Sequence, residues 1–125
     1  MVRTITSLHN PTVKNLVKLR QRRARDRQQL MLIDGARALR LALHNTFPVT
    51  TIYVAEDVAH TYADLLQRAR VAGIILQEVS AAVFHKIGYG DNPDGILGVA
   101  SQPKVHLTAL PARDLPLYVV TEGLE

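Results

Sequence analysis

The sequence contains no cysteine and no tryptophan, and only 5% of its 125 residues are aromatic. Without cysteine the chain can form no disulfide, thiolate metal site or cysteine nucleophile, and it suits a reducing compartment, so we expect a cytoplasmic location. The scarcity of aromatics predicts a core of aliphatic residues, as in helices packed on a small sheet. No apolar run approaches the roughly 20 residues that span a bilayer, so we expect no membrane partner.

Positive charge is concentrated in one part of the chain. The net charge is +4, but residues 14–40 alone carry +7 and the remainder carries −3. A solvated helix face is the alternative interpretation, yet it does not require such segregation, which favours a phosphate-rich partner such as RNA. The candidate RNA-binding residues are the cationic side chains Lys14, Lys18, Arg20, Arg22, Arg23, Arg25, Arg37 and Arg40.

Apolar periodicity predicts alternating helices and strands. Asn10 and Pro11 are typical of a helix start, and the helix is expected to run to about Arg23 with a cationic stripe opposite its apolar side. Further helices are expected at 35–45, 57–72 and after Ser80, and strands at 30–33, 51–54, 74–79 and 96–100. This alternation is typical of an α/β sandwich with a small, largely parallel four-stranded sheet.

Three side chains have expected local roles. Asp34 precedes the helix at 35–45 and is expected to be its N-cap, which would repel phosphate from that helix end. Asp64 is expected to pair with Arg68 across one helical turn. Tyr89, in the loop from 88 to 95, is a candidate stacking surface.

The composition changes after residue 101, where prolines interrupt every period. We therefore expect a domain at 1–101, a linker at 102–115, and at 116–125 the first strand of a second, truncated domain.

Four segments together resemble the SpoU (TrmH-like) family of RNA 2'-O-ribose methyltransferases. They occur in the family's order, at 10–14, 31–37, 93–99 and 119–125, and read NPTVK, MLIDGAR, PDGILGV and VVTEGLE. The sequence departs from the family pattern at Met31, where Phe is frequent, and at Asp94, where Gln is usual.

The resemblance implies a fold and a division of labour. The chain would be the amino-terminal substrate-binding domain, with an L30e-like α/β/α fold, and it would select ribosomal or transfer RNA. A second, trefoil-knotted domain would bind S-adenosylmethionine, hold the catalytic residues and form the homodimer. Residues 116–125 would begin that domain, so the parent protein would be the enzyme and this chain alone would be inactive.

The sequence offers no catalytic, cofactor-binding or metal-binding set of its own. The five histidines lack metal-ligand spacing, and no nucleophile with a neighbouring base is evident. Two alternatives stay open: a stand-alone L7Ae/L30e-like RNA-binding protein, and a protein-interaction domain whose basic helix meets an acidic partner.

Overall fold

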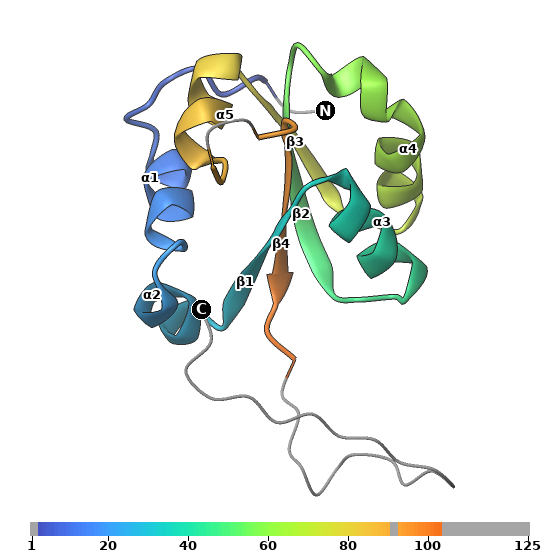
Figure 1. Cartoon of the computed structure of the whole chain (residues 1–125), viewed down its shortest axis with the longest axis horizontal. Coiled ribbons are helices and arrows are strands. Elements are labelled where there is room, and N and C mark those ends of the chain that lie inside the picture. The colour runs from blue at the N-terminus through green and yellow to red at the C-terminus, as the bar shows by residue number, and fades with distance from the viewer. Residues whose placement is uncertain (1–2, 91–92, 104–125) are drawn as a thin grey trace, which may run out of the picture.

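A computed structural model describes residues 3–90 and 93–103 of the chain (Figure 1). Along the chain the elements are α1 (Pro11–Lys18), α2 (Arg22–Gln28), β1 (Leu30–Asp34), α3 (Ala36–His44), β2 (Val49–Ala55), the 3-10 helix η1 (Ala59–Tyr62), α4 (Ala63–Val71), β3 (Ile75–Val79), α5 (Ala81–Ile87) and β4 (Ile96–Ser101). None of these helices is long and apolar enough to cross a membrane.

The four strands form one sheet in the order β1-β4-β2-β3. Strand β4 is antiparallel to both of its neighbours, whereas the neighbouring strands β2 and β3 are parallel. The expected α/β sandwich with a four-stranded sheet is confirmed, but the expectation of largely parallel pairing is wrong. Crossover helices join β1, β2 and β3, which share one direction, whereas β4 lies between β1 and β2 in the opposite direction. Apolar periodicity identifies a strand but carries no information on its direction.

Helices cover both faces of the sheet (Figure 1). Helices α3 and α4 lie on one side, and α1 and α5 lie on the other, with α2 beside β1. Each side has its own apolar cluster, one around Leu39, Ile52 and Leu65 and the other around Leu16 and Phe84. No polar side chain is buried among the described residues, so burial of aliphatic surface is the main stabilising contribution.

The expected helix from Pro11 to about Arg23 is two helices, because α1 ends at Lys18 and α2 begins at Arg22. Leu19 closes α1 and is only 1% exposed. The Arg25 guanidinium donates hydrogen bonds to the carbonyl oxygens of Leu19 and Arg20, at 3.0 and 2.8 Å. These bonds replace the amide donors that a continuous helix would have supplied, and they stabilise the turn.

Gly98 allows α3 to approach the sheet closely. A Cβ atom at this position would lie 2.4 Å from Cδ2 of Leu39, whose side chain is fully buried. The absence of a side chain at Gly98 therefore allows α3 to pack close to the centre of the sheet.

Gly98→Ala is expected to destabilise the fold by about 1–3 kcal/mol, because the added methyl group overpacks a full core. Urea unfolding measures the change. Leu39→Ala alone should cost about 2–5 kcal/mol by leaving a cavity. The double variant should lose less stability than the sum of the two single losses, because the cavity left by Leu39→Ala accommodates the methyl group added by Gly98→Ala. Additive losses would contradict the close contact.

Candidate functional site

Arg20 joins three elements at one end of the sheet. Its guanidinium donates two hydrogen bonds to the Asp34 carboxylate, at 2.7 and 2.8 Å, and a third to the carbonyl oxygen of Ile87, at 2.8 Å. The turn after α1, the end of β1 and the end of α5 are thereby held together. A two-pronged arginine–carboxylate pair of this kind is directional as well as strong.

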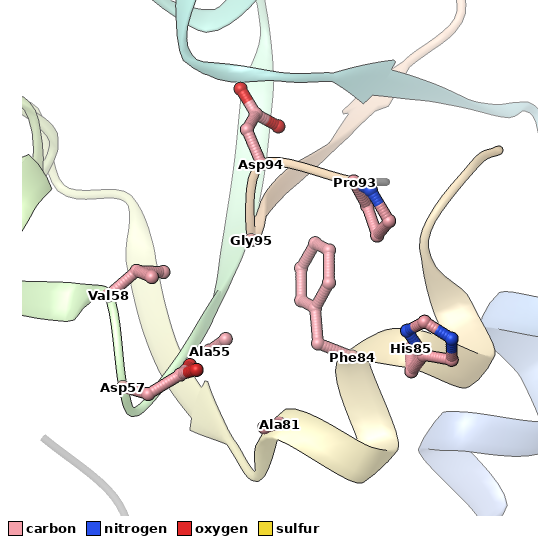
Figure 2. A pocket seen from close by; sticks show the side chains of 9 residues that line it. All are labelled: Ala55, Asp57, Val58, Ala81, Phe84, His85, Pro93, Asp94 and Gly95. Carbon is pink, nitrogen blue, oxygen red and sulfur yellow. The ribbon is translucent and has the colours of Figure 1, made fainter. Parts of the chain in front are cut away.

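The start of α3 is capped by Asp94 and not, as expected, by Asp34. Oδ2 of Asp94 accepts a hydrogen bond from the backbone amide of Ala36 at 3.1 Å, while Asp34 is engaged with Arg20. Figure 2 shows the Asp94 carboxylate turned away from the Phe84 ring and toward the segment that joins β1 to α3. A carboxylate at this place also interacts favourably with the positive end of the α3 dipole.

Tyr62 fixes the backbone at Asp94. Its hydroxyl donates a hydrogen bond of 2.7 Å to the carbonyl oxygen of Asp94. Burial raises the pKa of Tyr62, and the negative charge of Asp94 adds to the rise, so the hydroxyl remains a donor at neutral pH. Asp94, where the sequence departs from the SpoU pattern, is therefore held in place by hydrogen bonds to both its side chain and its main chain.

Two neighbouring hollows lie beside this cap and share Phe84, Pro93 and Asp94. The smaller, of about 190 Å³, is the one in Figure 2 and is lined by Ala55, Asp57, Val58, Ala81, Phe84, His85, Pro93, Asp94 and Gly95. The other, of about 310 Å³, is lined by Asp34, Gly35, Arg37, Phe84, Tyr89, Pro93, Asp94 and Ile96. We call this second one the Tyr89 hollow.

Tyr89 stands at the surface of that hollow with 73% of its area exposed. The Arg20 guanidinium carbon lies 5.6 Å from the centre of the Tyr89 ring, within the range of a cation–π contact. The exposure expected for this ring is thus present, and Arg20 lies against it.

The eight predicted RNA-binding residues fall into two groups. Four of them make contacts within the fold: Arg20 and Arg25 as described above, Arg40 with Asp64 at 2.9 Å, and Arg22 with Asp26 at 3.5 Å. The other four, Lys14, Lys18, Arg23 and Arg37, are exposed and have no carboxylate within 4.0 Å among residues 3–90 and 93–103.

The partner of Asp64 is Arg40 of α3, whereas Arg68 was expected. The hydrogen bond from Arg40 lowers the pKa of Asp64. Arg27 was left out of the predicted set, although it is exposed on α2 and also lacks a carboxylate neighbour in the described part of the chain. Arg27 lies four residues after Arg23, so the two share one side of a helix, and this spacing could have added Arg27 to the predicted set.

Solved RNA methyltransferases share this fold. An RNA 2'-O ribose methyltransferase is 33% identical, with a TM-score of 0.71 over 89% of this chain and 42% of that one. An rRNA methyltransferase from Sinorhizobium meliloti is 24% identical, with a TM-score of 0.73 over 86% and 40% of the two chains. The SpoU methyltransferase AviRb from Streptomyces viridochromogenes, in complex with AdoMet, is 21% identical, with a TM-score of 0.66 over 83% and 38%.

The present chain spans about two-fifths of the length of each of these structures. None of the curated proteins matches its sequence. The fold and the sequence likeness define a substrate-binding domain of SpoU-type RNA methyltransferases. Residues 10–98 match the family described as MRM3-like substrate binding domain, and the chain belongs to this family. The SpoU (TrmH-like) resemblance is confirmed. The predicted linker at 102–115 lies outside the described residues from residue 104 onward, as does the predicted strand at 116–125.

Arg20→Gln is expected to lower the free energy of unfolding by about 1–2 kcal/mol, because it removes charge-assisted hydrogen bonds from a side chain that is mostly shielded from water. Thermal or urea unfolding measures the loss. Arg23→Gln is the matched control, since Arg23 is exposed on α2, and it should change stability by less than about 0.5 kcal/mol. Equal effects of the two variants would mean that Arg20 does not hold the three elements together.

Proposed function

We propose that this chain selects the substrate RNA of an S-adenosylmethionine-dependent RNA 2'-O-ribose methyltransferase. Its first contact surface would be α1 and α2, which carry the exposed cations Lys14, Lys18, Arg23 and Arg27. The observation that carries the proposal is that these four lack carboxylate neighbours among the described residues, while the nearby Arg20 and Arg25 are engaged within the fold. The family and the solved relatives support RNA as the partner.

The four cations are arranged as two helical pairs. Lys14 and Lys18 are one turn apart on α1, and Arg23 and Arg27 are one turn apart on α2. Each pair therefore shares a side of its helix and can follow neighbouring phosphates. Contacts to phosphate position an RNA without reading its sequence, so this surface supplies affinity and orientation.

S-adenosylmethionine would be the methyl donor of the whole protein, and we assign its binding to the domain that follows. The two hollows described here are small for it. The smaller one, at about 190 Å³, is below the roughly 300–1,000 Å³ of ligand pockets, and the Tyr89 hollow is at their lower limit. The catalytic residues and the homodimer contact of the parent are likewise assigned to that second domain.

The two alternatives from the sequence find no support in the described residues. The family that matches and the solved relatives are those of RNA methyltransferases, and they lend no support to a stand-alone RNA-binding protein. An acidic protein partner would meet the same exposed cations, so competition between RNA and polyglutamate for the chain distinguishes the two partners.

The double variant Lys14→Gln/Lys18→Gln is expected to weaken binding to a structured RNA. The slope of log K against log salt should become shallower by about 1.4 to 1.8, since each lost phosphate contact accounts for about 0.7 to 0.9. Fluorescence anisotropy at several salt concentrations measures both quantities.

The matched control is Arg68→Gln/Arg70→Gln, which removes the same charge from exposed positions on α4, across the sheet from α1 (Figure 1). The control should bind nearly as tightly as the parent sequence. If both pairs reduce the slope equally, net charge alone drives binding and the proposed surface is wrong. Arg25 is not a suitable site for this test, because it stabilises the turn between α1 and α2.

The 125-residue chain alone is expected neither to bind S-adenosylmethionine nor to transfer its methyl group. Methylation requires a pocket that aligns the methyl group with the ribose hydroxyl and a group that activates this hydroxyl. Titration calorimetry should give no binding heat for this chain and a clear signal for a longer chain that includes the following domain. Micromolar binding to the short chain would overturn the division of labour proposed here.

A further inference from the structure

Tyr89 is the one exposed aromatic side chain among the described residues. The other exposed large apolar residues there are aliphatic, and Phe84 is 3% exposed. A tyrosine ring in water makes no contribution to the core, so its apolar face is available to a partner.

Arg20 restrains the Tyr89 ring, and close packing restrains the backbone just before it. Arg20 lies against the ring and is itself fixed by Asp34 and by the carbonyl oxygen of Ile87. The preceding residue, Gly88, packs so closely that an added Cβ atom would lie 2.8 Å from Pro93 and 3.0 Å from the Phe84 ring. An exposed ring that is already restrained loses less conformational freedom when a partner binds.

The surroundings of the ring combine three kinds of chemistry. Arg37 lines the same hollow and has no carboxylate within 4.0 Å in the described part of the chain. The carboxylates of Asp34 and Asp94 border the hollow too, but Arg20 neutralises the first and the start of α3 stabilises the second. The aromatic ring of Tyr89 matches a heterocyclic base, and the acceptor oxygens match base N–H donors. The Arg37 guanidinium, which has no carboxylate partner among the described residues, matches a phosphate.

We propose that the Tyr89 hollow binds one unpaired nucleotide of the RNA, whose base stacks on Tyr89 and whose phosphate contacts Arg37. The inference rests on the proposed function and deepens it, because it names an unpaired nucleotide as the feature that this domain recognises. In an RNA helix the bases are already stacked on one another, so a single exposed ring can only stack with a base from a loop, bulge or end. The cations of α1 and α2 would then hold the flanking backbone.

The experiment compares two RNA probes of equal length and charge: a hairpin with 2-aminopurine in its loop, and a fully paired duplex. Tyr89→Ala should weaken hairpin binding about 5- to 150-fold, the range found when a base loses an aromatic stacking partner, and change duplex binding less than twofold. Tyr89→Phe retains the ring and should restore hairpin binding. Quenching of 2-aminopurine fluorescence on binding should be lost with Tyr89→Ala alone.

Arg37→Gln tests the phosphate contact, and it should make the salt dependence of hairpin binding shallower by about 0.7 to 0.9. Arg68→Gln, at an exposed position on α4, is the matched control and should not change hairpin binding. Thermal unfolding of each variant verifies that the fold is intact.

Three results would overturn the nucleotide site. If Tyr89→Ala weakens hairpin and duplex binding equally, the residue acts only through the structure of the loop. If the hairpin and the duplex bind alike and Tyr89→Ala alters neither, the hollow is not a base site, while the phosphate-binding surface and the proposed function stand. If the chain binds neither probe at any salt concentration, the proposed function fails as well.

Discussion

The pair between Arg20 and Asp34 is the contact on which the arrangement of this domain depends. It connects a turn between two helices with the end of an edge strand, and the third hydrogen bond reaches the end of α5. The Arg20 side chain is 25% exposed, and its Nε atom is buried without a hydrogen-bond partner among the described residues. The guanidinium is therefore held against a desolvation cost, which its charge-assisted contacts must offset. Such a cost is unusual in a domain whose buried side chains, among the described residues, are all apolar.

The pair between Arg20 and Asp34 also determines which carboxylate can cap the start of α3. Because Asp34 is engaged with Arg20, the amide of Ala36 is capped by Asp94, which lies just before β4 and 58 residues later in the chain. The β1–α3 and Pro93–Gly95 segments are consequently held together, and the Tyr89 hollow lies between them and the end of α5. The carboxylate that departs from the SpoU pattern thus has a structural role, which a neutral amide oxygen could also fill as an acceptor but without the charge that favours a helix start.

Local signals predicted the elements well, and contacts between distant segments could not be predicted. Asn10 and Ser80 cap their helices as their positions indicated, by accepting hydrogen bonds from the amides of Thr12 and Val83. The break after Lys18 was missed because it depends on Arg25 reaching back to two carbonyl oxygens, whereas helical periodicity continues through it. The cap by Asp94 and the pair of Arg40 with Asp64 join residues far apart in sequence, and no spacing rule identifies them.

The cations between residues 14 and 40 also could not be assigned their roles from the sequence alone. A count of cations could not separate arginines that hold the fold from those that face solvent, because the two kinds are interspersed from the turn after α1 through α2 and α3. The folded structure separates them: Arg20, Arg25 and Arg40 have partners within the domain, while Lys14, Lys18 and Arg37 have no carboxylate partner in its described part. Since a cation already paired has less to gain from a phosphate, the capacity to bind RNA resides in the second group. Arginine's rigid fork suits the structural positions, since the compact ammonium of a lysine cannot reproduce the planar two-pronged pairing of Arg20 with Asp34.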